Sequence, residues 1–162
     1  MNRKTQVLCM ICMTILMLFL GATYVEGYKT ARSYMRSLNV EGMKFSDNDY
    51  MSGIDENTGW WEDYYKISGW AIHVGDSSTD VKMHIVLRDT DSKIFYELPS
   101  YLQSRNDVMD ALNLKDGIDH SKCGVGGTAR LSQIHGTYHI YILYQTSKED
   151  TLVDTGKEFT CE

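Results

Sequence analysis

The sequence lacks the short motifs that mark several common kinds of active site. It contains no H-E-x-x-H zinc motif and no G-x-S-x-G nucleophile elbow, and its histidines show no metal-ligand spacing. The glycine-rich stretch GVGG at residues 124–127 lacks the lysine and the strand-to-helix context of a phosphate-binding loop. We therefore predict no catalytic residues, no cofactor and no metal site.

Positive charge is also scarce outside the first residues of the chain. Beyond Arg3 and Lys4, 14 of the 16 basic residues remain against 22 acidic ones, so the formal charge of this part is about −8. Such a surface repels polyphosphates. We therefore expect no nucleic-acid partner.

One long apolar run stands near the N-terminus. Residues 7–25, VLCMICMTILMLFLGATYV, carry no charge, and a helix of this length can span a membrane. Two interpretations stay open: a signal peptide cleaved after a small-residue site near Ala22, or an uncleaved transmembrane anchor, which Tyr24 at an interfacial position favours. Both export the rest of the chain by the positive-inside rule. We expect a single-pass protein of the cell membrane with its C-terminal domain outside, or a secreted protein if cleavage occurs.

Cysteine is too rare in the exported part for a four-cysteine zinc site. Only Cys123 and Cys161 lie there, a number that fits one disulfide in an oxidising compartment and equally fits two buried or free thiols. Because both cysteines are expected at the ends of strands, we predict that they form a disulfide.

Three parts are predicted along the chain. Residues 1–27 form the membrane anchor or signal segment. Residues 28–59 combine apolar residues at helical spacing, up to about residue 39, with a polar stretch rich in glycine, serine and aspartate, which indicates a stalk helix and a linker. The acidic DNDYMSGIDE in this linker does not have the spacing of an EF-hand calcium loop. Residues 60–162 form the extracytoplasmic domain.

In the third part the apolar period changes to two. Alternation predicts strands over residues 65–74, 81–88, 93–98, 128–134, 138–144 and, less regularly, 151–161. Turn residues separate these runs at the spacing of a sandwich, and residues 104–114 predict a capped turn or short helix. The predicted fold class is all-β: an immunoglobulin-like β-sandwich of about six or seven antiparallel strands, preceded by one N-terminal transmembrane or signal helix.

Trp70 is predicted to be structural. It lies on the same alternating face as Ile72 and Val74, and an early-strand tryptophan commonly packs on the inner face of a sandwich. Gly69 before it indicates a bulge or a close backbone approach that seats the indole. We therefore predict that Trp70 fills the core.

The candidate ligand-binding residues are Trp60, Trp61 and Tyr64. They follow the polar linker and are interleaved with carboxylates. An aromatic face flanked by hydrogen-bond acceptors suits a sugar ring. The alternative is an edge strand that packs these aromatics onto the sheet.

Several segments together resemble a known family. ISGWAIHVG at residues 67–75, RNDVMDAL at residues 105–112 and CGVGGTARLSQIHGTYHIYIL at residues 123–143 are similar to the small β-sandwich accessory domains of bacterial glycosyltransferases and other cell-envelope polysaccharide proteins. Arg105 and Asp107 match the Arg-x-Asp-Val segment of such domains, and we predict that they fix the crossover through hydrogen bonds. The resemblance implies a stand-alone, membrane-tethered module without transferase activity, whose partner is an envelope glycan or a membrane protein of polysaccharide synthesis.

Two functions from different classes follow. The first is a non-catalytic binding or accessory module of the bacterial cell envelope. The alternative is a small secreted hydrolase or thiol enzyme that uses Cys123 and His120, because these residues lie close together in the sequence.

Overall fold

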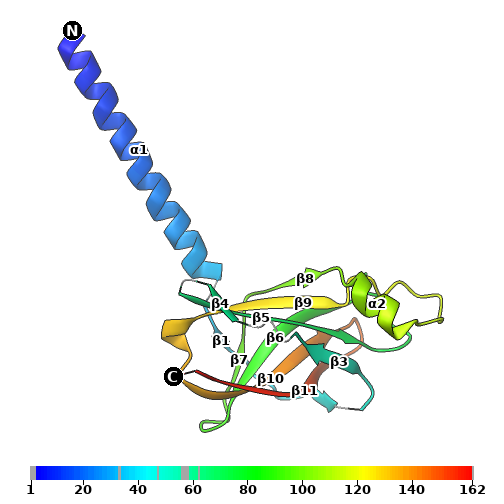
Figure 1. The fold of residues 1–162 in the computed structure, drawn as a ribbon. Helices are drawn as coiled ribbons and strands as arrows, with labels where there is room; N and C mark the ends of the chain where they lie inside the picture. Colours follow the sequence, from blue (N-terminus) through cyan, green and yellow to red (C-terminus); the bar gives the residue numbers. More distant parts are fainter. Residues whose placement is uncertain (1–2, 33, 47, 56–58, 62, 162) are drawn as a thin grey trace. The chain divides into compact units, whose positions relative to one another are not determined.

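The structure is a computed structural model that describes residues 3–32, 34–46, 48–55, 59–61 and 63–161, with side chains for residues 10–25, 34–46, 48–55 and 63–161. The chain forms two compact units, Met1–Arg32 and Ser33–Glu162. We call the second unit the β domain. Both are drawn in Figure 1.

The first unit is one helix, α1 (Arg3–Arg32). Its described large apolar side chains, between residues 10 and 25, are exposed. Within the described part of the chain, no helix is both long and apolar enough to cross a membrane. The predicted transmembrane helix is therefore not supported.

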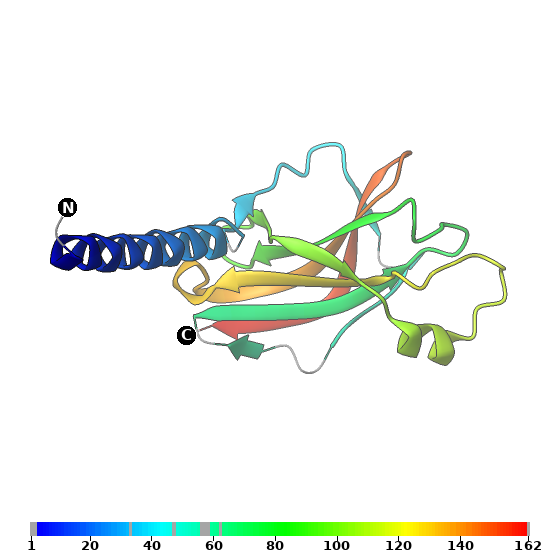
Figure 2. The ribbon, with the colours of Figure 1, turned by 90° about the horizontal axis from the view of Figure 1, so that it is seen from above.

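The β domain contains two sheets (Figures 1 and 2). In the larger sheet the order is β1-β7-β6-β10-β11-β2, and every neighbouring pair is antiparallel except β11 and β2. In the smaller sheet the order is β3-β5-β9-β8, with β4 also paired to β5. The large-sheet strands are β1 (Arg36–Ser37), β2 (Lys44–Ser46), β6 (Lys82–Asp89), β7 (Phe95–Glu97), β10 (Gly136–Gln145) and β11 (Asp150–Cys161). The small-sheet strands are β3 (Met51–Ile54), β4 (Gly59–Trp61), β5 (Tyr64–Ile72), β8 (Ser100–Gln103) and β9 (Gly124–Arg130).

The main core lies between the two sheets. Buried side chains from β5 and β9 meet those from β6, β10 and β11 in one cluster. Ile85 and Ile142, which are register partners on neighbouring strands, are both fully buried in it. The predicted inward faces of β6 and β10 are thus correct, and the all-β class is confirmed.

The β domain begins earlier than the sequence predicts. The segment 28–59 was expected to be a stalk helix and linker, yet α1 ends at Arg32 and β1, β2 and β3 lie within residues 36–54. Met35 is buried in the main core. The strands of this segment are short, lie at sheet edges and stand among polar residues. The sequence pattern therefore does not reveal them.

A short helix covers part of the small sheet. Helix α2 (Asn106–Leu112) follows β8, and Figures 1 and 2 place it at one end of the β domain. Together with Val108 of this helix, Ile72 and Cys123 form a separate buried cluster. The small sheet is therefore apolar on both faces at this end.

Candidate functional site

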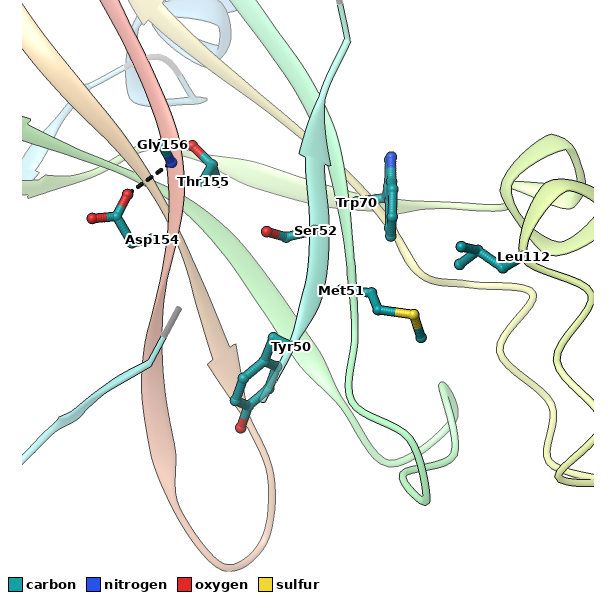
Figure 3. Close-up of a pocket in the computed structure, with 8 residues that line it drawn as sticks. All are labelled: Tyr50, Met51, Ser52, Trp70, Leu112, Asp154, Thr155 and Gly156. Carbon is teal, nitrogen blue, oxygen red and sulfur yellow. Dashed lines mark hydrogen bonds between the residues drawn. The ribbon is translucent and has the colours of Figure 1, made fainter. Parts of the chain in front are cut away.

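A hollow of about 640 Å³ opens beside β3, an edge strand of the small sheet. Among the described residues, β2 pairs with β11 only as far as Val153, opposite Ser46. The next residues of β11, from Asp154 to Gly156, line the hollow. We call this hollow the edge groove (Figure 3); its lining residues are Tyr50, Met51, Ser52, Trp70, Leu112, Asp154, Thr155 and Gly156.

One wall of the edge groove is a β-bulge. The register between β10 and β11 shifts so that Ile140 faces Lys157 and Tyr141 faces Asp154. The Thr155 hydroxyl donates to the Ile140 carbonyl at 2.6 Å, and the Gly156 N–H donates to Asp154 Oδ1 at 2.8 Å. Gly156 has a φ of 64°, a conformation that favours glycine. The bulge therefore fixes the Asp154 carboxylate at the groove.

Trp70 forms another wall. It is the register partner of Gly53, and a Cβ atom on Gly53 would lie 2.9 Å from Trp70 Nε1. The indole therefore lies over Gly53, where glycine leaves room for it. Its surroundings are the small-sheet cluster of Ile72, Val108 and Cys123, not the main core.

These contacts correct two predictions about residues 66–75, KISGWAIHVG. Trp70 does share a face with Ile72, but this is the outer face of the small sheet, and Trp70 is only half-buried. Ile67 and Ala71 fill the inner face instead. Gly69 does provide a close approach, since an added Cβ would lie 2.6 Å from the Gly53 carbonyl oxygen, but it does not seat the indole.

Tyr50 lines the groove just before β3 begins. Its ring centroid lies 4.9 Å from that of His73 and 5.1 Å from that of Tyr144. Its hydroxyl donates to Thr151 Oγ1 at 3.3 Å, which ties the groove to β11. Burial raises the pKa of Tyr50, so the hydroxyl stays a hydrogen-bond donor at neutral pH.

The edge groove combines an apolar surface with polar groups. The indole of Trp70 offers an apolar face, Ser52 and Thr155 offer hydroxyls, and Asp154 offers acceptor oxygens. Among the lining residues that the structure describes, Asp154 is the single carboxylate. No cluster of three or more metal-ligating side chains occurs among the described residues.

The predicted ligand-binding residues lie elsewhere. In β4, Trp60 pairs with Tyr65 and Trp61 pairs with Tyr64, but the side chains of both tryptophans lie outside the described residues. The Tyr64 ring has the Arg130 guanidinium 5.7 Å from its centroid. Since Tyr64 and Trp70 are six residues apart on β5, about 20 Å separates them. Tyr64 does not line the edge groove.

Arg105 and Asp107 form a hydrogen-bonded pair at the start of α2. Arg105 Nη2 donates to Asp107 Oδ2 at 2.8 Å, and Arg105 Nη1 donates to Asp55 Oδ1 at 2.9 Å. No sequence pattern marks Asp55 as a partner, because it precedes Arg105 by 50 residues and is brought near it only by β3. Hydrogen bonds from Arg105 lower the pKa of Asp107 and favour its charged form. This network ties α2, which carries Leu112 of the groove, to the small sheet.

The predicted disulfide is wrong, because both Cys123 and Cys161 are free thiols. The Ala71 N–H donates to the Cys123 carbonyl, which places Cys123 beside the end of β5. Cys161 lies near the opposite end of β5, because the ring of nearby Phe159 stacks on Tyr65 at that end. The two positions are about 20 Å apart along β5, far beyond the Cα separation of a disulfide.

We expect the two thiols to react at different rates in the folded protein. Burial raises the pKa of the Cys123 thiol, and Cys123 is only 2% exposed, whereas Cys161 is half-buried. Iodoacetamide at neutral pH should modify Cys161 at least about tenfold faster. Peptide mass spectrometry over time measures both rates, and alkylation in urea is the control in which they should converge. A peptide containing both cysteines joined before reduction would contradict this result.

The geometry does not favour a Cys123–His120 enzyme. A nucleophilic cysteine needs an accessible thiol with a lowered pKa, and Cys123 has the opposite properties. His120 is 2% exposed, and its Nε2 lies 2.8 Å from Asp116 Oδ2. The buried His120 ring is thus held by the exposed Asp116 in the loop before β9.

Comparisons of the chain with models of known families, with curated proteins and with solved structures found no match.

Proposed function

We propose that the β domain is a non-catalytic module that binds a neutral glycan of the bacterial cell envelope in the edge groove. The observation that carries the proposal is the lining of this groove of about 640 Å³, in which a half-buried indole lies on one side of β3 and two hydroxyls and one fixed carboxylate lie on the other (Figure 3). A sugar ring presents C–H groups to an aromatic face and hydroxyls to acceptors.

The charge of the groove favours a neutral ligand. Asp154 contributes a negative charge, and the described residues of the lining include no lysine or arginine. The whole chain has a formal charge of −6. A phosphorylated or carboxylated polymer would meet repulsion at this site, so an uncharged oligosaccharide fits better.

Three further arguments support a binding role. The resemblance of residues 67–143 to accessory domains of polysaccharide proteins implies the same kind of module. An immunoglobulin-like sandwich, which we also propose, provides rigid sheet edges on which such a site can be built. Export of the β domain, predicted from the basic start and apolar residues 7–25, places it where envelope glycans occur.

Binding to a glycan array tests the proposal. The full-length chain, kept in mild detergent because α1 exposes apolar side chains, should bind neutral oligosaccharides and not anionic ones. Asp154→Asn should lower the signal about tenfold, because it removes a charged acceptor but keeps an oxygen for the Gly156 N–H.

The matched control is Asp91→Asn, which removes an exposed carboxylate from the turn between β6 and β7. It should leave the signal unchanged. An array without any bound neutral glycan would overturn the proposed function, and equal losses in both variants would exclude the edge groove as the site.

A further inference from the structure

β3 is an edge strand with one open side. It pairs with β5 on one side, and among the described residues no strand pairs with its other side. Directly after β3, the Asp55 N–H donates to the Ser68 carbonyl at 2.8 Å. Because the backbone groups of an antiparallel strand alternate between its two sides, Ser52 and Ile54 turn theirs away from β5.

The backbone of β5 agrees with this direction. Ala71, the register partner of Ser52, donates its N–H to the Cys123 carbonyl and not to β3. In the described part of the chain, no backbone hydrogen bond reaches the outward groups of Ser52 or Ile54. Both residues are half-buried, so the open side of β3 is accessible. A further strand can use these donors and acceptors.

The edge groove provides a different environment on each side of β3. One side is polar and the other is apolar. The polar side is lined by Ser52, Asp154 and Thr155, and the apolar side by Met51, Trp70 and Leu112 (Figure 3). Successive side chains of a strand point to opposite faces of its sheet. A strand added to β3 therefore places alternate side chains in these two environments.

Asp154 sets the charge that the polar side accepts. It is the only charged residue among the described lining residues of the groove. No ion pair of Asp154 occurs within the described part of the chain. β2 stops opposite Val153, so its strand does not cover this carboxylate. A lysine or arginine on an added strand would complement it.

We infer that β3 also binds an extended segment of a partner protein by strand addition, with an apolar residue against Trp70 and a lysine or arginine at Asp154. Main-chain hydrogen bonds to Ser52 and Ile54 provide affinity, and the two environments provide specificity. The inference does not depend on the proposed function. Because the segment and the glycan fill the same groove, they exclude each other, and the partner thereby regulates glycan binding.

Capped synthetic peptides test the inference on the full-length chain in mild detergent. The parent peptide alternates valine with threonine and has lysine in place of its central threonine. Calorimetry should detect its binding. A peptide with glutamate in place of this lysine should bind at least about tenfold more weakly, because it meets the Asp154 carboxylate.

Two N-methylated forms of the parent peptide test the main-chain hydrogen bonds. One is methylated at the valine amides, and the other at the threonine and lysine amides. Only one of these two sets of amides faces β3 in an added strand, because the N–H groups alternate between the two sides. One form should therefore lose affinity by at least about tenfold, whereas the other should bind.

A proline variant tests the open side of β3 in the protein itself. Ser52→Pro removes the outward N–H and leaves the bonds from β3 to β5 in place, and proline is tolerated on the open side of edge strands. It should bind the parent peptide at least about tenfold more weakly than Ser52→Ala, the matched control, which lacks the same hydroxyl but keeps the N–H. Urea unfolding checks that both variants are folded. If Ser52→Pro does not fold, the N-methylated peptides decide alone.

Asp154→Asn tests the assigned charge and should bind the lysine and glutamate peptides equally. A lysine preference that survives in this variant would overturn the role of Asp154. Absence of binding by the parent peptide, equal binding of its two N-methylated forms, or equal affinities of folded Ser52→Pro and Ser52→Ala would overturn strand addition. The proposed function is decided separately on the glycan array, where Ser52→Pro and Ser52→Ala should give equal signals because both lack the Ser52 hydroxyl.

Discussion

Trp70→Ala should abolish glycan binding and lower the free energy of unfolding by about 2 to 3 kcal/mol. A fully buried tryptophan costs about 3 to 5 kcal/mol when truncated, and Trp70 is only half-buried on the outer face of the small sheet. Urea unfolding measures the stability change. Calorimetry with a neutral oligosaccharide that binds on the glycan array, at a temperature where the variant is folded, measures binding.

Tyr101→Ala separates a binding role of Trp70 from a general effect of aromatic removal. A Cβ on Gly126 would lie 2.7 Å from the Tyr101 ring, so Tyr101 lies over a glycine of the small sheet as Trp70 does over Gly53. This control should retain binding. If Trp70→Ala keeps full affinity, or leaves the urea midpoint unshifted, the position of the indole described above is wrong.

Arg105→Met should lower the free energy of unfolding by about 2 to 3 kcal/mol at pH 7. Methionine retains an apolar stem over Gly124, where an added Cβ would lie 2.5 Å from Arg105 Cγ, but it cannot donate hydrogen bonds. The Arg105 side chain is only 16% exposed, so its replacement removes hydrogen bonds to Asp55 and to the largely exposed Asp107 and leaves the guanidinium's place to an apolar chain. Urea unfolding checks the loss.

The effect of Arg105→Met should depend on pH. Hydrogen bonds from Arg105 lower the pKa of Asp107, so the stability from this pair is fully present above the unfolded pKa of about 4 and is lost as the pH falls through the lower folded pKa. The difference between wild type and variant should therefore shrink below about pH 4. Asp110→Asn, an exposed change on α2, is the control. A constant difference down to pH 2 would contradict the assigned role of Arg105.

The strands with regular alternation could be predicted because one face of such a strand packs into the main core and the other face does not. Along β6, Met83, Ile85 and Leu87 enter the main core, and the pattern of period two finds them directly. In β5 the same reasoning chose the wrong face for Trp70, because Ile67 and Ala71 on one face and Trp70 and Ile72 on the other are all apolar. Shifting the assumed alternation by one residue moves every side chain of a strand to the opposite face of the sheet.

Elements at the edges were harder to predict. β8 was not foreseen, and the start of β9 was missed because glycines at positions 124, 126 and 127 suggest a turn. In the structure, side chains of other strands pack closely against these glycines. For example, an added Cβ on Gly127 would lie 2.9 Å from Ile85 Cβ. Such a reason for glycine is visible only when the two sheets are packed.

The sequence by itself determined the all-β class, the inward faces of β6 and β10, the short helix after residue 104 and the acidic surface, because each depends on local period or on composition. Only the tertiary structure decided that Cys123 and Cys161 lie apart, that Asp55 reaches Arg105, and that Trp70 and Asp154 line the same groove at a sheet edge. These relations join residues many positions apart. They follow from strand order and register, which the alternation of single strands does not encode.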